Sequence, residues 1–416
     1  MEAYISALNY AIPFFLVLIL IEALVAQKKG LHVIRGMDTL ASLVSGVTNA
    51  IKDVLGLTVV IVSYGWMVDH LSLIKIEATW LVYLIAFVGL DFSGYWVHFI
   101  SHKVNYFWNH HLVHHSSEEF NLACALRQSI SNWFSITFVF LLPTALLGVP
   151  VAVIGIVAPL HLFAQYWYHT RLIGKLGILE HILVTPSHHR VHHAINDQYI
   201  DKNLGQIFIF WDKLFGTFQV ELADVPPVYG VKKAVRSWNP FIINFIHLWQ
   251  LIKDAYRTQS WLDKFVIWLK PTGWRPQDVM EKYPIQLIEN PYHMTKYDPV
   301  YPKFFQLWSW FQWTMISIIT MIIFNNASSI GFLGLLCYGG FSFLSIASMT
   351  MLMDKNSYAL LFEGIKNMIA LVLIFTSGDW FEINSVITHG AILIALYHVL
   401  SMIVVAYFHR MFSSVR

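Results

Sequence analysis

Residues 80–102 read WLVYLIAFVGLDFSGYWVHFISH, an apolar run that ends in two histidines four positions apart. The apolar part is long enough to cross a bilayer as a helix, because a crossing needs about 20 residues. His98 and His102 then lie on one face at the end of that helix, since residues i and i+4 are neighbours on a helix. The stretch therefore predicts a membrane span that delivers two imidazoles to one place.

The composition of the whole chain is typical of a multi-pass membrane protein. Of its 416 residues, 56% are hydrophobic and 12% are charged, whereas a soluble domain carries about 25% charged residues. The net charge of +2 gives no reason to expect nucleic acid as a partner. Only Cys124 and Cys337 are cysteines, which argues against a disulfide framework or a cysteine metal site. Histidine is the unusual residue, with 20 copies.

Hydropathy predicts an all-α integral membrane fold with about nine transmembrane helices. Lys28, Lys29 and Arg35 follow the first apolar run and place its end in the cytoplasm, so the N-terminus is expected outside or in a lumen and the C-terminus in the cytoplasm. The first run has no basic segment before it and is expected to be a retained span. The nine expected spans cover residues 4–26, 53–68, 80–100, 134–147, 151–168, 304–324, 330–349, 359–376 and 386–408.

The chain divides into four expected regions. They are N-terminal spans over 1–79, a catalytic region over 80–220, a more polar cytoplasmic or interfacial segment over 221–302, and C-terminal spans over 303–416. Within the polar segment, 241–256 and 261–269 are amphipathic and are expected to form interfacial helices.

Two further histidine boxes follow the first. They read His111-x2-His114-His115 and His189-x2-His192-His193, and positions i, i+3 and i+4 share a helix face, so each box can offer three nitrogens to one region. All the boxes fall at or just beyond the cytoplasmic ends of expected spans. The candidate metal ligands are His98, His102, His111, His114, His115, His169, His189, His192 and His193, with His161 or Gln165 as a further candidate.

Nine imidazoles exceed what one ion needs, so two metal ions are expected. Neutral imidazole suits iron, zinc, copper and nickel, and iron with open positions suits dioxygen activation. The sequence contains no His-Glu-x-x-His pattern of a zinc protease and no glycine-rich dinucleotide fingerprint, so electrons must come from an external donor. No catalytic residue is assigned beyond the ligands. Candidate acceptors for the second N–H of ligand histidines are Asp91, Glu118, Asp201 and Asn203.

Two non-enzymatic functions explain the histidines less well. A metal transporter needs ligands near the middle of the bilayer, whereas these boxes gather at one face. A haem-binding electron carrier would leave most of the boxed histidines unused.

The strings around the boxes resemble those of a known group of proteins. They are YWVH at 95–98, HLVHHSSE at 111–118, ALRQS at 125–129, PSHHRVHH at 186–193, IDKN at 200–203 and WDKLFGTF at 211–218. The pattern resembles the fatty acid hydroxylase and sterol desaturase superfamily of membrane di-iron enzymes, and within it the alkylglycerol monooxygenase family. The similarity is tight over 91–218 and looser through the C-terminal spans.

This resemblance implies hydroxylation of the carbon next to the ether oxygen of alkylglycerols, which yields a fatty aldehyde and a glycerol product, with tetrahydrobiopterin as electron donor. The alternative within the superfamily is a fatty acid or sterol hydroxylase or desaturase that uses a b-type cytochrome. Two positions depart from the pattern: Lys103 stands where the family has an acidic residue, and Gln165 stands where some relatives have histidine. The bacterial inner membrane and the endoplasmic reticulum are both compatible locations.

Overall fold

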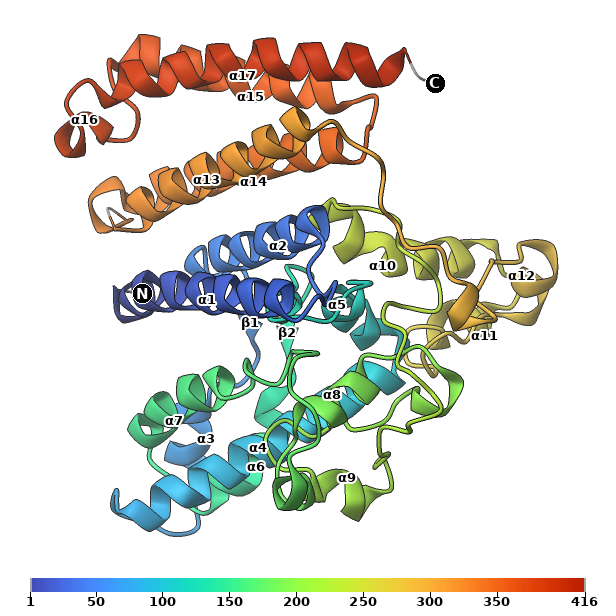
Figure 1. Ribbon diagram of the computed structural model, residues 1–416. Coiled ribbons are helices and arrows are strands. Elements are labelled where there is room, and N and C mark those ends of the chain that lie inside the picture. Colours follow the sequence, from blue (N-terminus) through green and yellow to red (C-terminus); the bar gives the residue numbers. More distant parts are fainter. Residues whose placement is uncertain (1, 326, 415–416) are drawn as a thin grey trace.

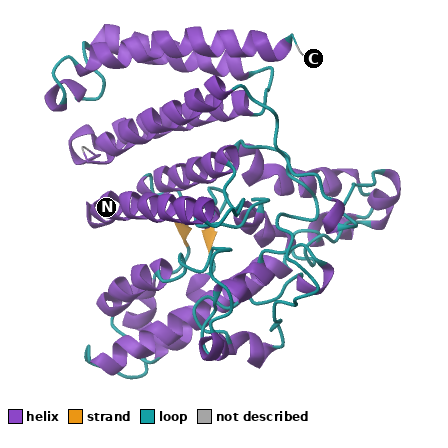
Figure 2. Ribbon diagram, viewed as in Figure 1, coloured by secondary structure: helices purple, strands orange, loops and turns teal. Residues whose placement is uncertain are grey.

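The computed structural model describes residues 2–325 and 327–414 and is mainly helical (Figure 1). Within these ranges the strands are two short segments, β1 (Val59–Val60) and β2 (Phe134–Ser135), which pair in parallel with Val59 opposite Phe134 (Figure 2). The predicted all-α class is therefore confirmed.

Among the described residues, five helices are long and apolar enough to cross a membrane, and each matches an expected span. They make the chain a membrane protein. They are Asn9–Lys28 within α1 (Glu2–Lys28), α4 (Trp80–Lys103), Ile330–Met353 within α14 (Ala327–Met353), α15 (Ala359–Ser377) and α17 (Gly390–Ser413).

The expected span over 53–68 is wrong as a single helix. The helix α2 (Gly36–Val54) ends where that span should begin, β1 follows, and α3 (Tyr64–Leu71) starts near its end. Hydropathy did not reveal α2, because this helix carries charged residues that the fold buries, such as Asp38 and Lys52.

The expected spans over 134–147 and 151–168 form shorter helices. At 1.5 Å per residue, α6 (Thr137–Leu146) and α7 (Val151–Phe163) are about 15 and 20 Å long, well below the roughly 30 Å of a bilayer core. The predicted tight turn joins them at Gly148, whose φ of +70° and closeness to the Ile74 carbonyl leave no room for a side chain. These helices make a short hairpin, so nine full spans are not confirmed.

The long helices form two stacks, with α1 and α2 between them (Figure 1). One stack holds α13 (Lys303–Asn325), α14, α15 and α17, which pack on α2 around a core that includes Leu40, Phe305 and Met353. The other stack holds α3, α4, α6 and α7. The short helix α16 (Ile383–Val386) precedes α17.

The remaining helices lie at one end of the spans or, around Trp211, beside α4, where the Trp211 and Phe92 rings have centroids 5.3 Å apart (Figure 1). The segments expected to be interfacial helices are helical, because α10 covers 241–256 and α11 covers the first part of 261–269, while their contact with a membrane surface stays a prediction. Exposed apolar side chains gather there, among them Trp249, Trp261 and Phe265. The helices of this part are α5 (Asn105–His115), α8 (Pro186–His192), α9 (Phe210–Phe215), α10 (Pro240–Arg257), α11 (Trp261–Val266) and α12 (Gln277–Lys282), with 3₁₀ turns at Cys124–Leu126, Gly177–His181, Asp197–Tyr199 and Pro291–His293.

Candidate metal centre

The nine predicted ligands come from three helices and one loop. The last turns of α4 carry the first box, α5 carries the second, and α8 with the residue after it carries the third. His169 lies directly after the turns that follow α7. All nine side chains converge between these segments.

The structure sorts the nine histidines into two groups. Within each group, one nitrogen of every residue lies within 4.8 Å of the others. Convergence of all the predicted residues is therefore confirmed, while their role as metal ligands remains a prediction. The first group is His98, His102, His111, His115 and His192, and the second is His114, His169, His189 and His193.

The second and third boxes are each divided between the two groups. A helix turns about 100° per residue, so position i+4 lies about 40° from position i, while position i+3 lies about 60° to the other side. His111 and His115 accordingly stay in the first group, while His114 points into the second. The rings of His115 and His193 stack with centroids 4.4 Å apart, which makes the two groups immediate neighbours.

Backbone carbonyls orient two rings of the first group. The Nδ1 of His98 donates to the carbonyl of Leu204 at 2.7 Å, and the Nδ1 of His192 donates to the carbonyl of Lys202 at 3.0 Å. A carbonyl can only accept, so the proton sits on Nδ1 and the Nε2 lone pair is free to face the group. This outward hydrogen bond is typical of histidines that bind metals.

Asp201 orients a third ring and explains one departure from the family pattern. Its carboxylate accepts from the Nδ1 of His102 at 3.2 Å and from the Nζ of Lys103 at 2.7 Å. Lys103 thus neutralises the acceptor of a candidate ligand. The predicted acceptor Asn203 contacts no candidate ligand ring through its side chain. Its amide donates to two backbone carbonyls instead and holds the loop that carries the acceptors.

The second group contains a pair of rings that cannot hydrogen-bond to each other. The Nδ1 of His114 donates to the carbonyl of Arg127, and the Nδ1 of His169 donates to the carbonyl of Tyr166, both at 3.3 Å. Each Nε2 then carries a lone pair, yet these two Nε2 atoms lie only 3.3 Å apart. A cation between them satisfies both lone pairs.

Burial keeps these imidazoles neutral. Removal from water lowers the pKa of His114 to about 4 and holds the pKa of His169 well below its usual value, with neighbouring histidines adding to the effect. The pKa values of His189 and His193 fall for the same reasons. Neither ring of the close pair is therefore protonated twice at neutral pH, and neutral imidazole is the form that binds metals.

The donor set fits a metal in a second respect. The buried Nε2 atoms of His102 and His192 have no hydrogen-bond partner among the described residues. An unpaired buried polar atom is costly unless something outside the protein satisfies it. Imidazole nitrogens alone make up both groups, which suits first-row metals such as iron and zinc.

His161, Gln165 and Asp91 stand apart from both groups. The Nε2 of His161 donates to Asp91 at 2.9 Å, and the amide of Gln165 donates to Gln206 at 3.2 Å. Asp91 also accepts from the indole of Trp211 at 2.9 Å. Among the candidate ligands, Asp91 therefore accepts from His161 rather than from a histidine of the first box, and its other side-chain partner is Trp211.

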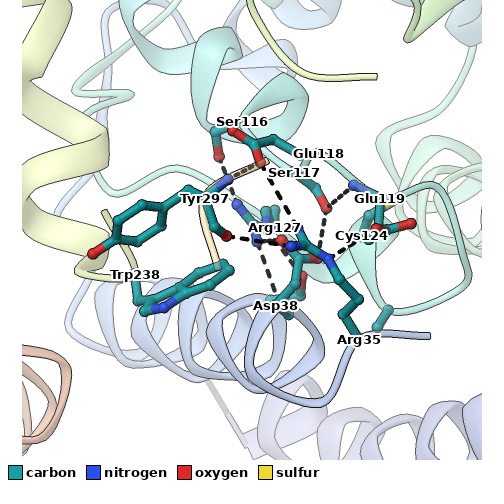
Figure 3. A network of polar contacts seen from close by, with 12 residues as sticks. Arg35, Asp38, Ser116, Ser117, Glu118, Glu119, Cys124, Arg127, Trp238 and Tyr297 are labelled. Atoms are coloured by element: carbon teal, nitrogen blue, oxygen red, sulfur yellow. Dashed lines mark hydrogen bonds and ion pairs between the residues drawn. The ribbon is translucent and has the colours of Figure 1, made fainter. Parts of the chain in front are cut away.

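The carboxylate of Glu118, a predicted acceptor for a ligand histidine, also lies away from both groups. Its carboxylate accepts from the backbone N–H of Tyr297 at 2.6 Å and lies 3.8 Å from the Arg35 guanidinium, rather than beside a histidine (Figure 3). Glu118 thereby connects the segment after the second box to the chain near residue 297.

Arg127 is a supporting residue that the sequence did not single out by itself. Its guanidinium donates to the Asp38 carboxylate at 2.7 Å and to Ser42 and Ser116 at 2.9 and 3.0 Å (Figure 3). Both charged groups are only 2% exposed. This buried ion pair fixes the carbonyl that accepts from His114.

Two cavities reach the histidines. One of about 460 Å³ lies among the spans, with Phe15 of α1, Val97 of α4 and Leu162 of α7 in its wall. The other, of about 280 Å³, lies outside the spans, between α5, α10 and residues 272–275. The polar segment 221–302, for which the sequence suggested no more than packing, therefore forms a wall of the site.

Comparison with known proteins decides the family. The fatty acid hydroxylase family model matches residues 83–217. The alkylglycerol monooxygenase of Homo sapiens is 32% identical over 366 residues, which are 87% of this chain and 81% of that protein. This chain belongs to the alkylglycerol monooxygenase family.

Other members of the alkylglycerol monooxygenase family match over the same extent. The proteins of Xenopus tropicalis and Danio rerio are each 32% identical to this chain, over 81% of their own lengths. No solved structure matches the chain. Membership makes the protein an oxidoreductase of the monooxygenase type, and together with the histidine groups it indicates an iron site.

Proposed function

We propose that the protein is a di-iron monooxygenase that hydroxylates the carbon next to the ether oxygen of an alkylglycerol. The hydroxylated product then collapses to a fatty aldehyde and a glycerol. The observation that carries the proposal is the close approach of unprotonated nitrogens in two adjacent groups, which calls for two cations side by side. The name alkylglycerol monooxygenase of the relatives supports the substrate.

Each group would hold one iron, with five histidines around the first and four around the second. Bound iron would supply dioxygen activation and the removal of hydrogen from an unactivated carbon. The protein's part is to keep nine imidazoles neutral and to aim their lone pairs inward. Asp201 and the carbonyls of Lys202, Leu204 and Arg127 do this by accepting the outward N–H groups.

The larger cavity suits a lipid substrate. Its apolar wall comes from membrane spans, so a lipid chain can reach it from the bilayer. Lys52 and Asp53 lie in the same wall with their charged atoms 3.1 Å apart, so their charges cancel. Neutral amides also line the cavity, including Asn49 and Gln128. Such a lining favours the uncharged, hydroxyl-bearing head of an alkylglycerol over a phosphate.

The proposed orientation places the N-terminus outside or in a lumen and the histidine groups and C-terminus in the cytoplasm. Lys28 at the end of α1 supports this, because cytoplasmic ends carry positive charge. The exposed aromatic residues of α10 and α11 support contact of segment 221–302 with the membrane surface. The membrane is proposed to be a bacterial inner membrane or the endoplasmic reticulum.

The test is an assay of purified protein in lipid nanodiscs. Protein reconstituted anaerobically with ferrous iron receives dioxygen, tetrahydrobiopterin and a defined 1-O-alkylglycerol, and fatty aldehyde is measured. Zinc-loaded protein is the matched control and should release none. Aldehyde from the iron protein alone supports the proposal. A hydroxylated or unsaturated fatty chain without aldehyde, formed with a b-type cytochrome, would support the second candidate, which the fatty acid hydroxylase family model favours.

A further inference from the structure

A buried carboxylate interrupts the first apolar span. Glu22 lies within Asn9–Lys28 of α1 and is only 3% exposed. Over residues 9–28 the buried side chains are Ile19, Glu22 and Ala26, which form one stripe on the helix at spacings of three and four residues. An ionisable side chain inside a span is costly and typically faces a polar partner in the protein interior. The partners of Glu22 therefore indicate its role.

Both carboxylate oxygens of Glu22 accept hydrogen bonds from segments that border the second group. One accepts from the Thr170 hydroxyl at 2.5 Å, and the other accepts from the backbone N–H of Leu122 at 2.7 Å. Thr170 directly follows His169 in the chain. Leu122 lies two residues after Phe120, whose ring stacks on that of His169 with centroids 5.9 Å apart. Glu22 thus joins two segments that enclose His169.

The third box holds Thr170 from a second direction. Arg190, which lies within that box, donates from its guanidinium to the Thr170 carbonyl at 3.1 Å. The same guanidinium is paired with Glu221 at 2.7 Å. Thr170 is therefore fixed through its hydroxyl to α1 and through its carbonyl to α8, so the backbone that follows His169 is held from both sides.

The helix α1 also contacts the residue that orients the His169 ring. The carbonyl of Tyr166 accepts from the Nδ1 of His169. The Tyr166 ring has its centroid 4.3 Å from that of Phe15, and its hydroxyl donates to the Phe15 carbonyl at 3.4 Å. Phe15 precedes Glu22 by about two helical turns and so lies on the same side of α1. One helix therefore supports the chain both before and after His169.

We propose that Glu22 is a positioning residue for the second metal ion, which it serves by holding His169 through Thr170 and Leu122. This inference rests on the proposed function, because it requires a metal ion in each group. A carboxylate accepts from two donors at once, whereas an apolar side chain would leave the Thr170 hydroxyl and the Leu122 N–H unpaired in a buried place. The loop that carries His169 would then shift, and the second group would bind its ion less tightly.

The first group provides an internal reference. Its rings are oriented by Asp201 and by the carbonyls of Lys202 and Leu204, which belong to the loop after α8 rather than to the segments that Glu22 contacts. A general loss of structure would weaken the binding of both ions. Loss of the Glu22 contacts alone should weaken the binding of one.

The test measures how tightly each ion is bound. Metal-free protein in nanodiscs is titrated with cobalt(II) against a chelator, which yields two dissociation constants, and the visible absorption of cobalt reports the ligand geometry. In Glu22→Leu one constant should rise about tenfold with a change in the cobalt spectrum, while the other constant stays the same. Glu22→Gln, which can still accept from Leu122 and donate to Thr170, should show a smaller loss. Thr170→Val removes the hydroxyl, leaves Glu22 in place and should reproduce part of the effect.

A second background shows whether Glu22 acts through the second group. In His169→Ala the weakly held ion is already lost, so adding Glu22→Leu should leave the remaining dissociation constant unchanged. Glu363→Gln is the matched control, because Glu363 is a fully buried carboxylate in the span α15 and accepts from Ser348 at 2.6 Å. This control should lower the melting temperature without altering either constant.

Melting temperatures show whether each variant is folded, and Glu22→Gln and Thr170→Val keep the test decisive if Glu22→Leu is not. Wild-type constants in folded Glu22→Leu and Thr170→Val would overturn the inference. Equal weakening of both ions, or further weakening of the remaining ion in the double variant, would overturn it as well. All these results leave the proposed function standing. Binding of a single ion by the wild-type protein would instead contradict the proposed di-iron function, and the inference would fall with it.

Discussion

The Nε2 atoms of His114 and His169 lie 3.3 Å apart, while the Nδ1 atom of each ring donates to a backbone carbonyl. Two neutral imidazoles held in this way present lone pairs to each other. In the protein without metal this arrangement is unfavourable, and a bound cation turns it into a pair of ligand bonds. Metal binding should therefore stabilise the fold as well as enable the reaction.

Removal of one ring should cost one metal ion. In His169→Ala the second group keeps three histidines, and iron content should fall from about two to about one per chain. His110→Gln is the control, because His110 lies beside the second box but in neither group. Elemental analysis of both purified proteins decides the matter. Two ions retained in His169→Ala would show that His169 is not a ligand.

The Arg127–Asp38 pair should stabilise both the fold and His114. Asp38→Ala leaves a buried arginine without its partner, so the free energy of unfolding should fall by about 3–5 kcal/mol, and metal content should fall with it. The exposed pair of Lys232 with Asp197 is the comparison, and Lys232→Ala should change stability by about 1 kcal/mol or less. Equal thermal shifts in the two variants would contradict the role of the buried pair.

Charge at position 103 should act through Asp201. Asp201→Asn weakens the acceptor of the His102 N–H, so metal affinity should drop about 10- to 100-fold. Lys103→Met should have a smaller effect, because the His102 contact remains. Lys103→Glu places a second negative charge beside Asp201 and should have a larger effect than Lys103→Met. Metal affinity is measured by competition with a chelator, and identical affinities for these two lysine variants would refute the argument.

Acid should destabilise the metal-free protein. Burial holds the pKa of His114 at about 4, whereas an unfolded histidine titrates near 6.5. Above about pH 6.5 this ring is neutral in both the folded and the unfolded protein, so its protonation does not lower the free energy of unfolding. As pH falls from there toward 4, the unfolded state takes up protons first, so the free energy of unfolding decreases. Melting temperatures at pH 7.5, 6 and 5 should fall in that order, and a constant value would contradict the burial of neutral rings.

The candidate ligands were predictable because helical spacing is a local property. The i, i+3 and i+4 spacings of the three boxes identify eight of the nine histidines that converge in the two groups, and His169 is the ninth. The division of the second and third boxes between two groups does not follow from spacing alone, because positions i, i+3 and i+4 lie on one broad helix face. The position of neighbouring helices decides which ring points where.

The groups that accept the outward N–H of the candidate ligands were predictable only in part. Asp201 was found because a carboxylate is a recognisable acceptor, but the carbonyls of Lys202, Leu204 and Arg127 could not be, since every residue carries a carbonyl. Asp91 accepts from His161 rather than from the nearby first box, because its helical position near His98 does not determine which way its carboxylate turns.

The fold was predictable where spans are long and uniformly apolar, as in α4 and α17. It was not predictable at α2, where buried charge lowers the hydropathy, or at α6 and α7, which are apolar but short. Segment 221–302 forms a wall of the cavity of about 280 Å³ outside the spans, and this depends on long-range contacts that hydropathy does not report.

The most direct test is the rate of aldehyde release measured against iron bound per chain. Metal-free protein in nanodiscs is loaded anaerobically with zero to three equivalents of ferrous iron and assayed with a 1-O-alkylglycerol, dioxygen and tetrahydrobiopterin. Two adjacent groups of histidines predict that the rate rises until two irons are bound and then stays constant. A rate that reaches its maximum at one iron, or aldehyde release by the metal-free protein, would contradict a di-iron centre.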